Sequence, residues 1–429
     1  MTPEAALAFW FGRINYEVRS AAAGDLKLER MRALLRLLGN PHERVRTVHI
    51  AGTKGKGSTA AMLDSVLRSA GYRVGLFTSP HLERVEERIC VDAVPITGPE
   101  LAARMDEIAA AVRVLDAGPP PHSTFFEIST ALGFLHFACR RVDVAVVEVG
   151  LGGRFDSTNV CRPLVSAITC IGLDHTAQLG GTLEEIAFQK AGIAKRRVPL
   201  VSGEVDPGPQ RVIARVAAES GSPLVQAGRD FPLESDHEIG LLGRHQRANA
   251  AIAVAVVNEL RRTGMPIAER AVVRGLAAVR WPARVEIVSH SPTVVLDTAH
   301  NVPSAEALVA TLRQSVPAAG KKTVVFAVSS DKDYAAILRI LAGYFDAFHL
   351  TQYGNNPRCV PPEKLAEVLA GISHHASVSV YSTSREAWFA ARANSGPTDV
   401  VCVTGSVFLA GELQPFVRQI AAGTERSAP

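Results

Sequence analysis

Seven consecutive residues, from Gly52 to Ser58, have the composition of a loop that binds phosphate groups. They contain three glycines and two lysines and lie between a predicted strand at 47–51 and a predicted helix at 59–70. Backbone N–H groups and the N-terminus of the helix can face a phosphate chain, and Lys56 would reach its terminal phosphates. A solvated turn is the alternative interpretation. The predicted ATP contacts are Gly52, Thr53, Lys54, Gly55, Lys56, Gly57 and Ser58.

This loop differs from the general P-loop pattern at two positions. Ile50 stands where the first glycine belongs, and Gly57 follows Lys56 where a serine or threonine normally binds magnesium. The hydroxyl arrives one residue later, at Ser58. The hydroxyl that binds magnesium is therefore expected to come from another part of the chain.

Two polar residues follow buried strands, where open α/β sheets place their ligands. Glu148 is the only acid in the apolar run VAVVEVG at 144–150, and His175 comes shortly after the apolar segment 165–171. Glu148 is either a magnesium ligand or a core carboxylate with hydrogen-bond partners, because an unpaired acid inside a sheet is costly. His175 is either structural or a second ligand at the same edge, with Asp174 beside it to orient the ring.

Lys190 lies on the apolar face of a predicted helix that begins with the capping sequence Thr182-Leu-Glu-Glu185 and continues to about residue 194. Burial lowers the proton affinity of a lysine, and a neutral amine can react with carbon dioxide to give a carbamate, which is a new carboxylate. A lysine whose stem is buried and whose ammonium reaches solvent is the alternative from spacing alone.

The surrounding pattern predicts an α/β protein with two domains. Apolar β-branched segments without alternation indicate strands of a parallel sheet buried on both faces. From residue 293 onward, five strand-like segments alternate with helix-like ones, which indicates a second α/β domain. Trp281-Pro282 ends a helix-like stretch near the boundary. We expect a P-loop domain with a parallel sheet at 1–288 and a smaller Rossmann-like domain at 289–429.

Composition sets limits on the class of protein. The net charge is +4, and 47% of the 429 residues are apolar. The sequence contains no long block of like charges, which would indicate a nucleic-acid or membrane partner. The six cysteines are far apart, and the N-terminus lacks the basic start and apolar stretch of a secretory signal. We therefore expect a cytoplasmic enzyme with reduced thiols that acts on small molecules.

Many segments in order resemble the folylpolyglutamate synthase and dihydrofolate synthase family of the Mur-type ligases, over nearly the whole chain. They are HIAGTKGKGST (49–59), LFTSPHLERVEERI (76–89), TFFE (124–127), EVGLGGRFDSTN (148–159), IGLDHT (171–176), QKAGI (189–193), GRHQRANAA (243–251), WPARVE (281–286), LDTAHN (296–301), DKD (331–333), NPR (356–358) and GS (405–406).

The resemblance implies a role for each matching residue. One Mg²⁺ would join the ATP phosphates to Ser79 and Glu148, and a second would be held by His175 near a carbamylated Lys190. Catalysis would rest on Lys56, His175 and Lys190. The adenosine contacts would be Asn249, Arg284, Asp297 and His300, and the residues on the pterin or folate side would be Arg84, Phe126 and Asp156.

The activity that the resemblance implies is ATP-dependent addition of L-glutamate to dihydropteroate or a reduced folate through an acyl phosphate, by a monomer. Several positions differ from the family pattern: Thr298 replaces a glycine, Gln189 replaces an acid, residues 83–87 are more acidic, and the segment 231–241 is shortened. A Mur-type ligase for another carboxylate and a P-loop nucleotide switch are the alternatives. A switch would not need a second domain with its own ATP contacts.

Overall fold

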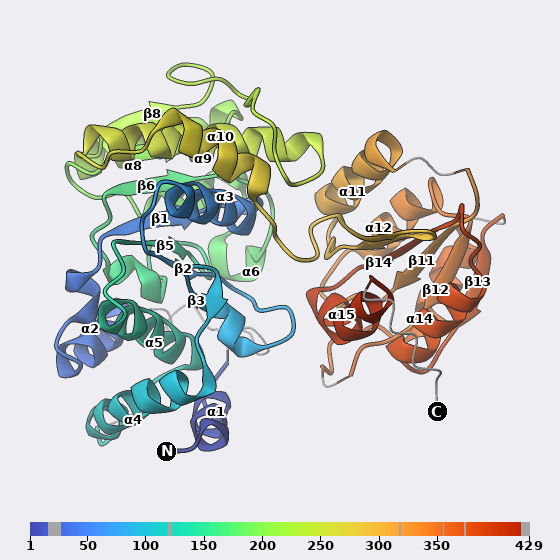
Figure 1. Ribbon diagram of the computed structural model, residues 1–429, viewed down its shortest axis with the longest axis horizontal. Coiled ribbons are helices and arrows are strands. Elements are labelled where there is room, and N and C mark those ends of the chain that lie inside the picture. Colours follow the sequence, from blue (N-terminus) through green and yellow to red (C-terminus); the bar gives the residue numbers. More distant parts are fainter. Residues whose placement is uncertain (16–26, 119–121, 317–318, 355, 373–374, 422–429) are drawn as a thin grey trace. The chain divides into compact units, whose positions relative to one another are not determined.

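The computed structural model describes residues 1–15, 27–118, 122–316, 319–354, 356–372 and 375–421 (Figure 1). The chain forms two compact units. The first contains residues 1–81, 85–240 and 246–279, and the second contains residues 82–84, 241–245 and the chain from Arg280 onward. The expected boundary between residues 288 and 289 falls inside strand β9 (Glu286–His290), whereas the compact units divide at Arg280.

The first unit is built on an eight-stranded sheet in the order β4-β3-β2-β5-β1-β6-β7-β8. Its pairs are parallel except β2–β3 and β3–β4. The central strands are buried along their whole length, which explains their continuous apolar sequence. The strands are β1 (Thr47–Ala51), β2 (Val74–Phe77), β3 (Ile89–Val91), β4 (Val94–Pro95), β5 (Val144–Glu148), β6 (Val165–Ile168), β7 (Leu200–Ser202) and β8 (Leu224–Gln226).

Helices cover both faces of this sheet, with α3, α9 and α10 on one side and α2 and α5 on the other (Figure 1). The helices are α1 (Pro3–Phe11), α2 (Leu28–Leu37), α3 (Lys56–Ser69), α4 (Gly98–Leu115), α5 (Phe125–Cys139), α6 (Thr176–Leu179), α7 (Leu183–Ala191), α8 (Pro207–Ser220), α9 (Arg244–Arg262) and α10 (Glu269–Ala278), with short 3-10 turns η1 (Pro41–Arg44), η2 (Val85–Arg88) and η3 (Ser157–Val160).

Helix α3 differs from its prediction in two ways. It begins at Lys56 rather than Thr59, so the end of the glycine loop forms its first turn. It is also buried continuously from Gly57 to Leu67, rather than on one face. Because Gly275 of α10 has no Cβ, the backbone of α10 can approach Val66 closely. A helix enclosed on all sides gives the phosphate loop a rigid support.

The second unit has a six-stranded sheet in the order β13-β12-β11-β14-β10-β9. All pairs are parallel except β10–β9, and β9 was not predicted. Its elements are β9, β10 (Thr293–Leu296), α11 (Val302–Ser315), β11 (Lys322–Phe326), α12 (Tyr334–Ala342), β12 (Ala347–Leu350), α13 (Pro362–Ala370), β13 (Ser377–Val380), α14 (Ser384–Ala393), β14 (Val400–Thr404) and α15 (Val407–Ala421). The prediction of an α/β protein with two sheets is confirmed.

All six cysteines are free thiols. Within the described ranges, no helix combines the length and the apolar character that crossing a membrane requires.

Candidate active site

The phosphate loop is shaped by glycines at two positions where its backbone has positive φ. Gly52 has φ 149° and lies against the Thr169 hydroxyl, whereas Gly55 has φ 81° and lies against the amide of Asn249. A side chain at either position would collide with these groups. Gly55 precedes α3 directly, and the first N–H groups of a helix have no partner within it. The loop can therefore offer backbone donors to an anion.

Hydrogen bonds join this loop to the chain that follows β6. Thr53 N donates to Cys170 O at 2.7 Å, and the Thr53 hydroxyl donates to Gly172 O at 3.1 Å. The Thr169 hydroxyl donates to Lys54 O at 2.5 Å. These bonds hold the segment that leads to His175 in a fixed position next to the loop.

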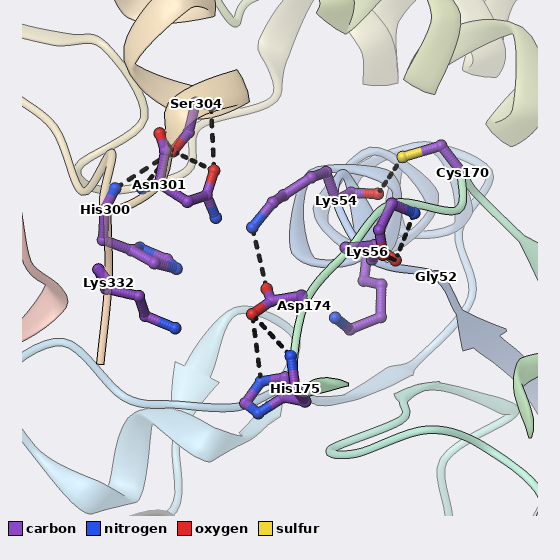
Figure 2. A network of polar contacts seen from close by, with 12 residues as sticks. Gly52, Lys54, Lys56, Cys170, Asp174, His175, His300, Asn301, Ser304 and Lys332 are labelled. Atoms are coloured by element: carbon purple, nitrogen blue, oxygen red, sulfur yellow. Dashed lines mark hydrogen bonds and ion pairs between the residues drawn. The ribbon is translucent and has the colours of Figure 1, made fainter. Parts of the chain in front are cut away.

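Each lysine of the loop forms an ion pair with a carboxylate located at or beyond the end of a neighbouring strand. Lys56 Nζ lies 3.9 Å from Glu148 Oε1, and Lys54 Nζ lies 3.1 Å from Asp174 Oδ2. Figure 2 shows Lys54, Asp174 and His175 next to one another. Asp174 accepts the backbone N–H of His175 at 3.1 Å, and its distance to the ring Nε2 is 3.9 Å. Asp174 therefore pairs with Lys54 and fixes the backbone turn at His175. Its carboxylate also lies near the ring of that histidine.

Glu148 lies at the end of β5, beside Lys56 of the phosphate loop. Its side chain is buried at the end of β5, in register with Ile50, and its Oε2 accepts the backbone N–H of Ser79 at 3.2 Å. Within the described ranges, no group of three or more His, Cys, Asp or Glu side chains could hold a metal ion alone. Mg²⁺ commonly takes one or two protein ligands and completes its shell with phosphates and water. The Ser79 and Glu148 pair fits that type of site.

Lys190 is buried, with 5% of its surface exposed, and its Nζ donates to Gly52 O at 2.8 Å. Burial, followed by the positive charge of Lys56, lowers the pKa of Lys190 from 10.5 to about 7. The predicted capping box at Thr182 and Glu185 starts its helix, α7. A substantial fraction of Lys190 is therefore neutral near pH 7, and reaction with carbon dioxide requires the neutral amine.

The three residues predicted on the substrate side lie in different surroundings. The ring of Phe126 covers Gly150 and packs edge-on against Phe77, with 6.1 Å between ring centroids. Asp156 is buried and accepts the backbone N–H of Leu151 at 2.8 Å and that of Thr158 at 3.0 Å. Arg84 is exposed and belongs to residues 82–84 of the second unit. Phe126 and Asp156 therefore both adjoin the loop that follows Glu148.

The predicted adenosine contacts are fixed by hydrogen bonds within their own units. Asn249 Nδ2 donates to Gln246 Oε1 at 2.9 Å, beside Gly55. Asp297 accepts the N–H groups of Val285 and Ala299 at 3.0 and 2.6 Å, and burial raises its pKa against the effect of nearby Arg284.

Thr298, which replaces the glycine of the family pattern, holds Arg284. Its hydroxyl accepts from Arg284 Nη1 at 2.8 Å. His300 Nδ1 lies 2.8 Å from Thr298 O, and because a carbonyl only accepts, Nδ1 carries a hydrogen. His300 is followed by Asn301 and Ser304, which cap α11 (Figure 2).

Sequence reasoning missed a buried polar network beneath the loop that follows β5. His49 Nε2 lies 2.8 Å from the hydroxyl of Thr158, which also hydrogen-bonds to Asp156. It also missed the pair between Ser329 and Tyr353, 2.7 Å apart, in segments that follow β11 and β12. The only sequence signal for the His49 network was a histidine inside the predicted buried strand Thr-Val-His-Ile-Ala.

Both units match models of Mur ligase domains. The Mur ligase middle domain matches residues 50–202, and the glutamate ligase domain of Mur ligases matches residues 283–407. A dihydrofolate synthase/folylpolyglutamate synthase of Bacillus subtilis (strain 168) is 35% identical over 425 residues, covering 94% of this chain and 96% of the relative. The chain belongs to the folylpolyglutamate synthase/dihydrofolate synthase family.

Solved structures of this family match nearly the whole length of the chain. E. coli FolC in complex with DHPP and ADP has a TM-score of 0.84 at 31% identity, covering 99% of both chains. The Yersinia pestis folylpolyglutamate synthase/dihydrofolate synthase complexed with AMPPNP and Mn ion has a TM-score of 0.82 at 31% identity, covering 97% of this chain and 98% of that one. Those family members bind adenine nucleotides, and one of them also holds a divalent cation.

Proposed function

We propose that this protein is an ATP-dependent ligase that adds L-glutamate to the carboxylate of dihydropteroate or of a reduced folate. One observation carries the proposal. A glycine loop with an ion-paired Lys56 and an adjoining buried Lys190 lies in a chain that matches both Mur ligase domains and full-length folate ligases.

The reaction follows from the chemistry of a carboxylate, which is a poor electrophile for an amine in water. An oxygen of the pteridine substrate's carboxylate attacks the γ-phosphorus of ATP, and ADP leaves. The amine of L-glutamate then attacks the acyl carbon of the acyl phosphate, and phosphate departs with the original carboxylate oxygen. Lys56 and the backbone N–H groups of the loop would offset the charge on the phosphoryl group during its transfer.

Ser79 and Glu148 would hold Mg²⁺ bound to the ATP phosphates. His175 and carbamylated Lys190 would hold a second ion. When bound, these ions would neutralise phosphate charge and hold the reacting carboxylate. The lowered pKa of Lys190, about 7, supports its proposed carbamylation. Asn249, Arg284, Asp297 and His300 are the proposed adenosine contacts.

The pteridine substrate would lie along Phe126, with Asp156 and Arg84 as further contacts. The aromatic ring of Phe126 is held in place by Phe77 and by Gly150 and offers a flat apolar surface of the kind on which a pterin ring stacks. We further propose that the protein acts as a monomer in the cytoplasm.

Phosphate release by the purified protein tests this function. The protein is incubated with Mg-ATP and L-glutamate, with dihydropteroate in one reaction and tetrahydrofolate in another. Release that depends on glutamate with dihydropteroate would establish the synthase activity, and release with tetrahydrofolate would establish glutamate-chain extension. ATP binding without release in either reaction would reject a folate substrate and favour a Mur-type ligase for another carboxylate.

A further inference from the structure

His49 occupies the centre of the parallel sheet, where an imidazole is difficult to accommodate. It is fully buried in β1, between β5 and β6. Burial, followed by the charge of Lys195, lowers the pKa of His49 to about 3, so the ring is neutral at pH 7. Its Nδ1 has no hydrogen-bond partner among the described residues. Burying an unsatisfied polar atom is unfavourable, so an apolar residue would be expected here unless Nε2 has a role.

The partners of His49 fix the direction of a chain of hydrogen bonds. The Thr158 hydroxyl donates to Asp156 Oδ1. A hydroxyl has one hydrogen, so the oxygen of Thr158 must accept from His49 Nε2, which lies 2.8 Å away. His49 is therefore the tautomer with hydrogen on Nε2 and a bare Nδ1. Hydrogen bonds run in one direction, from β1 to the carboxylate of Asp156.

That carboxylate organises the loop from Gly150 to Thr158, which follows Glu148. Its Oδ2 accepts from Leu151 N at 2.8 Å, and its Oδ1 accepts from Thr158 N at 3.0 Å. Arg154 N donates to Gln189 O at 2.8 Å, which joins the loop to α7. The loop is thus fastened to α7 by its backbone and to β1 through His49.

We propose that His49 is a positioning residue that holds Asp156 through Thr158, and thereby holds the Gly150–Thr158 loop in the conformation that binds the pteridine substrate. This inference rests on the proposed function, in which Asp156 contacts that substrate. The proposed role also predicts that loss of His49 affects binding of the pteridine substrate and not binding of ATP. Strand β1 keeps its backbone pairing with β5 and β6 whatever side chain stands at position 49. The phosphate loop should therefore stay in place when His49 is replaced.

Four substitutions separate the hydrogen bond from the volume of the side chain. His49→Gln keeps a side-chain donor, and Thr158→Ser keeps the hydroxyl. By contrast, His49→Leu removes the donor, and Thr158→Val removes the hydroxyl. We expect the latter two to raise the KM for the pteridine substrate about ten-fold, the cost of one lost hydrogen bond, and to leave the KM for ATP within about two-fold. The double variant His49→Leu/Thr158→Val should be no worse than Thr158→Val alone, because the valine already removes the hydroxyl to which His49 donates.

His136→Gln is the matched control, because His136 is a buried histidine of α5 outside this hydrogen-bond chain. It should leave both KM values unchanged. An equal rise of the two KM values in His49→Leu, or additive losses in the double variant, would overturn the proposal. Recovery in His49→Gln supports it, whereas a His49→Gln defect as large as that of His49→Leu would overturn it.

Hydrogen exchange tests the same linkage without any activity. Exchange of the N–H groups of Leu151 and Thr158 should become about ten-fold faster in His49→Leu and stay as in the native protein in His136→Gln. ¹⁵N NMR of the His49 ring should give the neutral Nε2–H tautomer between about pH 5 and pH 9. Unchanged exchange, or the Nδ1–H tautomer, would refute the positioning role even if the ligase activity is found. Faster exchange in a protein without ligase activity would reject only the proposed function.

Discussion

Replacement of Lys190 by methionine should stabilise the protein in mildly acidic solution while abolishing the proposed ligation. Lys190 is 5% exposed, and burial together with Lys56 lowers its pKa from 10.5 to about 7. Methionine has a similar length and no charge, so it can occupy the site without a proton. The perturbation removes the titrating group and preserves most of the packing of α7.

The shift sets the size and the pH range of the effect. Between pH 7 and pH 10.5 the unfolded chain binds the Lys190 proton more tightly than the folded chain, so the stability of the native protein rises with pH over this interval. Below about pH 7 the full penalty applies, about 5 kcal/mol, and at pH 9 roughly 2 kcal/mol remains. Loss of the hydrogen bond to Gly52 O costs about 1 kcal/mol at every pH.

The methionine variant should therefore be more stable than the native protein by about 4 kcal/mol at pH 6 and by about 1 kcal/mol at pH 9. Urea unfolding at both pH values, in buffers free of carbon dioxide so that no carbamate forms, measures the difference. Lys27→Met is the control, because Lys27 is exposed and should give no change between the two pH values. An advantage that is equal at pH 6 and pH 9, or a variant less stable at pH 6, would refute the reasoning.

Further substitutions test individual groups. Lys190→Ala should abolish ligation and recover part of it when short carboxylic acids are added, whereas full activity without them would reject the carbamate. Glu148→Gln should raise the Mg²⁺ concentration needed for half-maximal activity by about ten-fold or more, because one ionic ligand is lost, and an unchanged Mg²⁺ dependence would exclude Glu148 as a magnesium ligand. Gly150→Ala places a Cβ against the ring of Phe126 and should raise the KM for the pteridine substrate but not for ATP, so equal effects on both would contradict a substrate role for that ring. Asp297→Ala should raise the KM for ATP strongly, and an unchanged value would exclude Asp297 as a nucleotide contact.

Local signals predicted much of the fold because they depend on neighbouring residues only. The capping box at Thr182 and Glu185 and the apolar segments of β1, β5 and β6 match the structure closely. The start of α3 was placed three residues too late, because Gly57 and Ser58 are poor helix formers whose helical conformation is stabilised by burial in the first unit. Strand β9 was missed because its side chains are only partly buried and include Glu286, Ser289 and His290.

The site required contacts between residues far apart in the chain. Lys190 donates to Gly52 across 138 positions, and His49 meets Thr158 across 109. The spacing of Lys190 on its helix indicated burial but could not identify the group that it faces. Likewise, the motif around Asp156 could not reveal that its carboxylate accepts hydrogen bonds from its own loop. Such partners follow from the sheet register and from packing.

In the proposed reaction, the substrate carboxylate is activated by phosphoryl transfer before glutamate attacks. The most direct test uses dihydropteroate or tetrahydrofolate labelled with ¹⁸O in the reacting carboxylate, with unlabelled ATP, L-glutamate and Mg²⁺. We predict that each phosphate released carries one ¹⁸O atom from that carboxylate and that the pteridine product gains one glutamyl group. Phosphate without ¹⁸O, or label in AMP, would contradict an acyl-phosphate intermediate.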